Sequence, residues 1–164
     1  MNTPILSIKK DQDVRVLVNM VVEDDSLIPE YKTSGASGAD LRANENCVLQ
    51  PLERKLIKTG VRVSIPQGFE GQVRARSGLS AKKGLTLVNG IGTIDGDYTG
   101  EILVSMINLS DEPQEIHKDD RIAQLVIVPV IQALFNPVEN LEDTERGEGG
   151  FGHTSVQLDR FLKL

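Results

Sequence analysis

Two acids and a tyrosine crowd one turn in the middle of the sequence. Residues 92–100 read GTIDGDYTG, with Asn89 and Gly90 just ahead and β-rich apolar runs on both sides. Asp-Gly between such runs is typical of a β-hairpin, so a plain turn is one interpretation. That interpretation leaves the second acid and the tyrosine without a purpose. A carboxylate that stays ionised near a triphosphate acts as a general base toward water, so the segment also fits phosphate-ester hydrolysis.

A second candidate site is the segment 74–79, RARSGL, where a strand-like run ends and a short helix-like run begins. Helix N-termini present free backbone N–H groups and a partial positive charge, and Arg76 with Ser77 would complete an anion site. Phosphate is the ligand that this arrangement fits. The alternative is an ordinary helix start that Ser77 caps.

The third candidate is the glycine-rich segment 146–152, RGEGGFG. Its glycines match the GxGxxG spacing, but a dinucleotide fingerprint must follow a strand and open a helix within a βαβ unit, and only residues 153–164 remain after it. We interpret the segment as a flexible lid. In it, backbone approaches phosphates closely, Arg146 grips them and Phe151 stacks on a base. A disordered tail is the alternative.

Metal-binding residue types are sparse. Asp40, in the run SGADL, faces a metal ion or simply caps a turn. His117 and His153 are far apart in the sequence with no third ligand, so zinc is not expected. The single cysteine, Cys47, offers neither a disulfide framework nor metal-ligand spacing.

The elements that must position these residues are short strands. The nearly continuous apolar run 14–22 predicts a strand buried on both faces, whereas 69–76 alternates and predicts a half-exposed strand. Further strand-like runs lie at 48–50, 55–58, 61–65, 101–108 and 121–131. Only 77–84 looks helical, with Gly84 at its end. Many short strands without βαβ alternation predict an all-β, single-domain, jelly-roll-like β-barrel with one short helix.

A length of 164 residues suits one domain with tails. We expect an N-terminal extension at 1–13, the β-barrel domain at 14–135 and a flexible, glycine-rich C-terminal arm at 136–164, which is too poor in apolar residues to fold alone. The net charge of −6 argues against polymeric nucleic acid as a partner, because a duplex needs a basic face. No run approaches the ~20 apolar residues of a membrane span, and no secretory signal is recognisable, so we expect no membrane partner and a cytoplasmic location.

In their order along the chain, five segments resemble the five motifs of the trimeric deoxyuridine triphosphatase (dUTPase) family. The segments are 36–42, 76–79, 89–100, 120–124 and 146–154, so the likeness spans roughly residues 14–155. It implies a jelly-roll subunit, a homotrimer with active sites at subunit contacts, and Mg²⁺-assisted hydrolysis of dUTP to dUMP and pyrophosphate. In the cell, that activity limits uracil incorporation into DNA and supplies dUMP for thymidylate synthesis.

The resemblance also implies a role for individual residues. Asp95 would activate the water that attacks the α-phosphorus, and Tyr98 would pack on the deoxyribose and exclude a 2′-hydroxyl. Asp40 would reach Mg²⁺ through water. Uracil would be read by Asn89 and by the hairpin at Gly92, Thr93 and Ile94. The phosphates would be bound by Arg76, Ser77, Gly78 and Gln124, and the closing arm would contribute Arg146, Phe151 and Gly152.

Two details and three alternatives accompany this interpretation. Arg121 and Gln124 have opposite parity on a regular strand, so only Gln124 is expected to face the site and Arg121 is expected to be structural. The run after Gly152 is His-Thr-Ser, where many family members have Ser-Thr-Gly. A dCTP deaminase or a bifunctional deaminase-hydrolase shares the fold, but deaminases typically carry Arg-Ser-Ser in the second motif and lack the arm. A nucleotide-sensing interaction protein is the third alternative.

Overall fold

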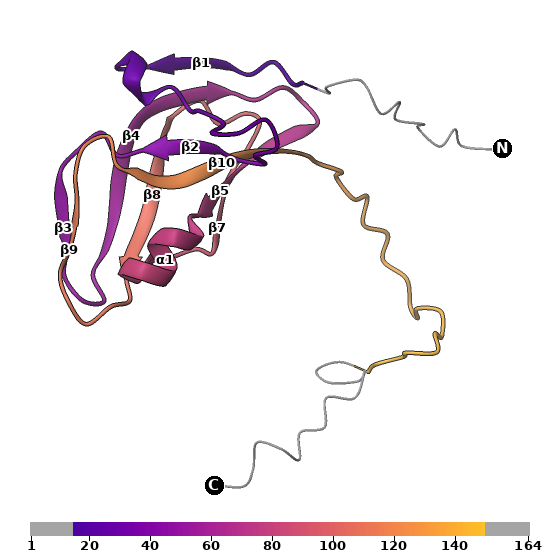
Figure 1. The fold of residues 1–164 in the computed structure, drawn as a ribbon. Coiled ribbons are helices and arrows are strands. Elements are labelled where there is room, and N and C mark those ends of the chain that lie inside the picture. Colours follow the sequence, from indigo (N-terminus) through magenta and orange to yellow (C-terminus); the bar gives the residue numbers. More distant parts are fainter. Residues whose placement is uncertain (1–14, 150–164) are drawn as a thin grey trace, which may run out of the picture. The chain divides into compact units, whose positions relative to one another are not determined.

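The computed structural model describes residues 15–149 and divides the chain into two units, Met1–Ile131 and Gln132–Leu164. All strands and helices of the described range belong to the first unit (Figure 1). One antiparallel sheet has the order β1 (Asn19–Val22), β4 (Arg54–Ser64), β8 (Glu101–Asn108), β6 (Leu85–Leu87). A second has the order β2 (Ala39–Arg42), β10 (Arg121–Pro129), β5 (Phe69–Ala75), β7 (Ile91–Ile94), and β3 (Cys47–Leu49) pairs with β9 (Gln114–Ile116).

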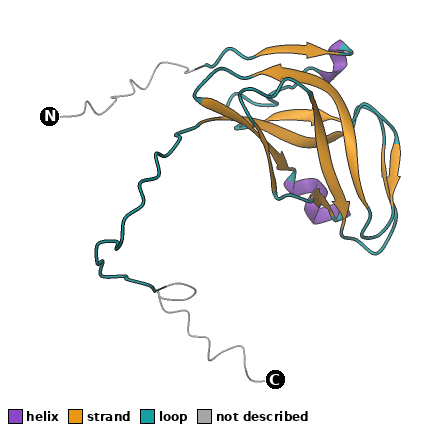
Figure 2. Ribbon diagram, turned by 180° about the vertical axis from the view of Figure 1, so that it is seen from behind, coloured by secondary structure: helices purple, strands orange, loops and turns teal. Residues whose placement is uncertain are grey.

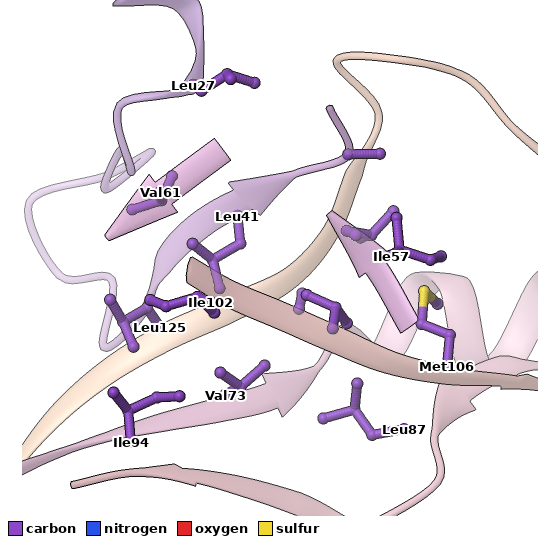
Figure 3. Close-up of a cluster of buried hydrophobic side chains, with 14 of the residues drawn as sticks. Leu27, Leu41, Ile57, Val61, Val73, Leu87, Ile94, Ile102, Met106 and Leu125 are labelled. Carbon is purple, nitrogen blue, oxygen red and sulfur yellow. The ribbon is translucent and has the colours of Figure 1, made fainter. Parts of the chain in front are cut away.

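One apolar core lies between the two four-stranded sheets. It takes Ile57 and Ile102 from the first sheet and Leu41 and Leu125 from the second, all at most 5% exposed (Figure 3). Along β8, buried and more exposed residues alternate, as expected of strands with one face on a core. The predicted all-β, jelly-roll-like class is confirmed.

The run 14–22 departs from its prediction. Only its end forms a strand, β1, and the side chains there are mostly exposed, with Leu17 83% and Val21 68% exposed. The prediction of a strand buried on both faces is therefore wrong for the described residues. The reason is position in the sheet: β1 is an edge strand that pairs with β4 alone.

Helical structure in the described range is limited to α1 (Ser77–Lys83) and the 3₁₀ turn η1 (Asp25–Leu27), both visible in Figure 2. Gly84 ends α1 in the left-handed conformation, with φ 65°, as predicted. The N-cap is Arg76, whose φ of −93° and ψ of 120° are not helical, and Ser77 is already the first helical residue. Ser77 is therefore not the cap that the sequence suggested.

The described part of the second unit, residues 132–149, contains no helix or strand. Large apolar side chains are exposed along it, among them Leu134 at 97%, Phe135 at 89% and Leu141 at 87%. Its end is organised by turns, in which Gly147 N donates to Thr144 O at 3.0 Å. Within residues 15–149, no helix has the length and apolar character needed to cross a membrane.

Candidate active site

Asp40 of β2 lies buried between two arginines. The carboxylate is 5% exposed, its Oδ2 accepts a hydrogen bond from Arg121 Nη1 at 3.0 Å, and its Oδ1 lies 3.2 Å from Arg76 Nε. The contact with Arg76 is an ion pair without hydrogen-bond alignment, since that Nε is buried and makes no hydrogen bond in the structure. Arg76 Nη1 also donates to Arg121 O at 2.8 Å. These three residues, which we call the Asp40 cluster, therefore hold one another in place.

Strand register explains how the Asp40 cluster forms. On β10, Gln124 is paired with Asp40 of β2 on one side and with Arg74 of β5 on the other. A β-bulge shifts the β10–β2 register between Arg121 and Ala123, so Arg121 and Gln124 both lie on the Asp40 face. The parity argument assumed a regular strand, and its conclusion that the two residues cannot share a face is wrong.

Gly38 leaves room for the side chain of Gln124. A Cβ at Gly38 would lie 2.9 Å from Gln124 Cβ, closer than real side chains approach, so only glycine fits there. Gln124 is thereby packed beside the Asp40 cluster, as the resemblance implied for a residue of the phosphate site.

A pocket of about 170 Å³ adjoins the Asp40 cluster at α1 and the start of β10. Its lining combines three cationic side chains, two carboxylates and apolar residues: Arg76, Lys83, Arg121, Glu115, Asp120, Leu79, Leu85, Ile116 and Ile122. Ser77 and Gly78 are exposed at the start of α1, where the first N–H groups have no partner within the helix. This end of the second sheet therefore offers cations and backbone donors to an anion.

The hairpin between β7 and β8 carries the second group of predicted residues. Asp95 is exposed directly after β7, and its carbonyl accepts a hydrogen bond from Tyr98 N at 3.1 Å. The Tyr98 hydroxyl donates to Glu101 O at 2.8 Å, and its ring lies over Gly100, where a Cβ would come within 2.5 Å of the hydroxyl oxygen. The carboxylate thus stands free in solvent, whereas the tyrosine beside it is held at both its amide and its hydroxyl.

Residues ahead of Asp95 present backbone as much as side chains. Asn89 and Thr93 are exposed, Gly90 takes a φ of 68°, and Gly92 packs against Val73. Ile94 is 9% exposed and belongs to the core. Its part in reading a base is therefore limited to its backbone.

Asp95 and Arg76 lie at opposite ends of the paired strands β5 and β7. Gly71 pairs with Ile94 and Arg74 with Ile91, so Asp95 follows the end of β7 next to Glu70, six positions along β5 from Arg76. At about 3.3 Å per residue, that spacing is about 20 Å. One subunit alone does not bring the hairpin acid and the Asp40 cluster to the same phosphate group.

The remaining predicted residues are dispersed. Arg146, in the second unit, is exposed, and its Nε donates to Gly149 O at 2.7 Å. Phe151 and Gly152 lie outside the described residues. Burial raises the pKa of the Cys47 thiol, so this cysteine is protonated at neutral pH and is no nucleophile.

Sequence reasoning missed two residues that the structure brings into play. Arg121 joins the Asp40 cluster only because of a β-bulge, which left no recognisable signal in the sequence. Glu101 supports the hairpin from the first position of β8. An acid directly after Gly100, at the start of a strand, was the available signal.

Comparison with known proteins was consistent across three levels. The family model described as dUTPase matches residues 24–155. The deoxyuridine 5′-triphosphate nucleotidohydrolase of Nautilia profundicola is 53% identical over 133 residues, covering 81% of this chain and 94% of that protein. The enzyme of the same name from Finegoldia magna is 50% identical over 139 residues, covering 84% and 97%.

Solved structures agree. A Staphylococcus bacteriophage 80alpha dUTPase with dUpNHpp superposes with a TM-score of 0.78 at 31% identity, covering 85% of this chain and 99% of that one. A dUTPase mutant from phage phi11 of S. aureus, which coordinates a structural Mg(II) ion, has a TM-score of 0.71 at 28% identity, covering 78% and 100%. With its all-β fold and a family match across most of its length, the chain belongs to the dUTPase family.

Proposed function

We propose that this chain hydrolyses dUTP to dUMP and pyrophosphate, with Asp95 as the general base. The observation that carries the proposal is the hairpin: an exposed carboxylate directly after β7, beside a tyrosine held at both its amide and its hydroxyl. Family membership and relatives named for this activity at 50–53% identity support it.

Asp95 accepts a proton from a water molecule as the water oxygen attacks the α-phosphorus. The bond between the α-phosphorus and the bridging oxygen breaks, and pyrophosphate leaves. A positioned base of this kind contributes roughly 10²–10⁴-fold to the rate. Tyr98 packs on the deoxyribose, so a 2′-hydroxyl has no room.

The hairpin backbone at Gly92, Thr93 and Ile94, together with Asn89, reads uracil. A thymine methyl group collides with such a closely fitting backbone, and cytosine presents its donors and acceptors in the reverse order. Each buried polar group left unpaired costs on the order of 1–3 kcal/mol, so cytosine is rejected strongly.

The site is shared within a homotrimer. The separation of about 20 Å between Asp95 and Arg76 supports this assembly, since the phosphates of one substrate need both. Apolar side chains on the outer face of the first sheet also need cover: Leu56 is 58%, Leu103 is 40% and Val88 is 42% exposed. In this arrangement Arg76, Ser77, Gly78 and Gln124 of one subunit bind the phosphates of a nucleotide held by another subunit's hairpin.

The C-terminal arm, residues 136–164, closes over the nucleotide from the third subunit. Arg146 clamps the phosphates, and Phe151 and Gly152 cover the base. Exposed Leu141 and the neighbouring Phe135 and Leu134 support a segment that finds its apolar contacts on another subunit. The N-terminal extension, residues 1–13, precedes the β-barrel domain and has no assigned role.

Mg²⁺ fits this site as an ion that arrives with the triphosphate. No group of three or more metal-binding side chains gathers within the described range, and both Asp40 oxygens already face arginines. Each of these oxygens keeps a lone pair, so Asp40 is able to hold a water of the hydrated ion. Mg²⁺ commonly uses few carboxylates, several waters and substrate phosphates. When bound, it neutralises phosphate charge. A reducing cytoplasm suits the single free Cys47.

The test is pyrophosphate release from dUTP, dTTP, dCTP and UTP, measured side by side with Mg²⁺. We expect rapid release from dUTP alone. Asp95→Asn keeps dUTP binding and loses roughly 10²–10⁴-fold or more in turnover, whereas Asp97→Asn, two residues along the same hairpin, retains it. Ammonia release from dCTP would contradict the hydrolase proposal, and undiminished turnover of Asp95→Asn would contradict the role of that carboxylate.

A further inference from the structure

Glu101 begins β8 directly after the hairpin loop, and its side chain crosses to the neighbouring strand β4. Its Oε1 accepts hydrogen bonds from Gly60 N at 2.8 Å and from Thr59 N at 3.1 Å. These amides lie where the β4–β8 pairing is irregular, between Lys58 and Arg62. One carboxylate oxygen therefore satisfies two backbone donors that the sheet itself leaves without a partner strand.

The part of β4 that Glu101 contacts is a rigid anchor. Gly60 has a φ of 67°, and a Cβ there would lie 2.7 Å from Leu27 Cδ1 and 2.9 Å from Asn44 Nδ2. Thr59 is fully buried, and its hydroxyl donates to Ile102 O at 2.6 Å. Because this bend is packed on every side, it holds whatever is bonded to it in one position.

The same residue holds Tyr98 from its other end. The backbone carbonyl of Glu101 accepts the Tyr98 hydroxyl at 2.8 Å, and Gly100 between them leaves no space for a side chain beneath the ring. A continuous chain of hydrogen bonds thus runs from the buried bend at Thr59 through Glu101 to the tyrosine hydroxyl.

We propose that Glu101 is a positioning residue that fixes Tyr98 against the sugar and thereby sets the preference for deoxyribose over ribose. The inference rests on the proposed role of Tyr98. Without the carboxylate, two partly buried amides lose their acceptor and the first residues of β8 are free to shift. Because a displacement of about 1 Å at a positioning group costs on the order of 10²-fold, even a small shift opens room for a 2′-hydroxyl.

Two substitutions separate reach from charge. Glu101→Gln keeps an oxygen at the same distance and loses the charge, whereas Glu101→Asp keeps the charge and withdraws it by one methylene. Glu45→Asp is the matched control, because Glu45 Oε1 accepts Lys58 N of the same strand at 3.0 Å and no described contact joins it to the hairpin.

For each variant, kcat and KM are measured separately for dUTP and UTP, together with a thermal melt. We expect Glu101→Asp to lower the dUTP/UTP ratio of kcat/KM by at least about tenfold, and Glu101→Gln and Glu45→Asp to stay within about threefold of the parent ratio. A parent-like ratio in Glu101→Asp would overturn the proposal, as would an equal loss in Glu45→Asp or in Glu101→Gln.

If Glu101→Asp does not fold, Tyr98→Phe replaces it, since this change removes only the hydroxyl end of the chain of hydrogen bonds. An unchanged dUTP/UTP ratio in Tyr98→Phe also overturns the inference. Asp95→Asn is assayed in the same series to separate the two proposals. Its undiminished turnover counts against the proposed general base, whereas the Glu101 ratios report on sugar discrimination alone.

Discussion

Asp40→Asn is the substitution whose effect the structure defines best. The parent carboxylate is 5% exposed, with its two oxygens 3.2 Å from Arg76 Nε and 3.0 Å from Arg121 Nη1. Asparagine keeps the shape of the side chain but turns an NH₂ group toward a guanidinium that only donates. At least one arginine therefore loses its acceptor, and neither keeps its ion pair.

The magnitude follows from how deeply the partners are buried. A hydrogen bond to a charged group contributes about 1.5–3 kcal/mol, and breaking a fully buried ion pair costs about 3–5 kcal/mol. Arg76 is 24% and Arg121 is 40% exposed, so water recovers part of the lost interaction for both cations. We therefore expect the free energy of unfolding to fall by about 2–3 kcal/mol, which corresponds to a Tm lower by roughly 6–10 °C.

The assay is guanidinium or thermal unfolding at one fixed protein concentration, because the stability of an oligomer depends on concentration. Asp97→Asn, an exposed acid of the hairpin, is the control and is expected to change the free energy by less than about 0.5 kcal/mol. An equally small change in Asp40→Asn would refute the ion pairs. Affinity for dUTP is measured with and without Mg²⁺. Loss in both conditions is expected if Asp40 acts through Arg76, and loss only with Mg²⁺ would assign Asp40 to the ion instead.

Two further predictions concern stability. Asn108 is fully buried, its amide donates to Leu49 O at 3.0 Å and Glu112 O at 2.8 Å, and its Oδ1 accepts from Ser110. Asn108→Ala is therefore expected to cost about 2–4 kcal/mol in denaturant unfolding, and a loss below about 1 kcal/mol would contradict this. The backbone hydrogen bond from Lys58 lowers the pKa of Glu45, so its contribution to stability is present above its unfolded-state pKa and is lost as pH falls through the lower folded-state pKa. The stability difference between the parent and Glu45→Gln should shrink from about pH 7 to about pH 3, and a constant difference would be inconsistent with the shift.

Local signals in the sequence were sufficient for the fold class and for several elements. The Asp-Gly hairpin after β7, the strand 69–75 and the end of α1 at Gly84 agree with the structure. Each depends on a turn residue or an alternation within a few neighbouring positions, where the backbone preferences of those residues act directly. The order of the five motifs likewise pointed to the dUTPase family, which the family match bears out.

Features that depend on neighbouring strands were not readable from the sequence. The apolar run 14–22 resembles a buried strand, but its burial depends on whether another layer covers it, and in the described chain β1 is an edge. Glu101 resembles any acid at a strand start, and only the irregular β4–β8 register brings it to Thr59 and Gly60.

The Asp40 cluster illustrates the same limit most sharply. Its arginines are 36 and 81 positions from Asp40 along the chain, and strand parity placed Arg121 on the wrong face. The bulge in β10 reverses that parity, since one extra residue turns every later side chain to the other face. The sequence by itself determined which residue types are available and which turns and strands they form locally. Pairing and register between distant strands, which depend on the packing of both sheets around one core, decided which of them meet.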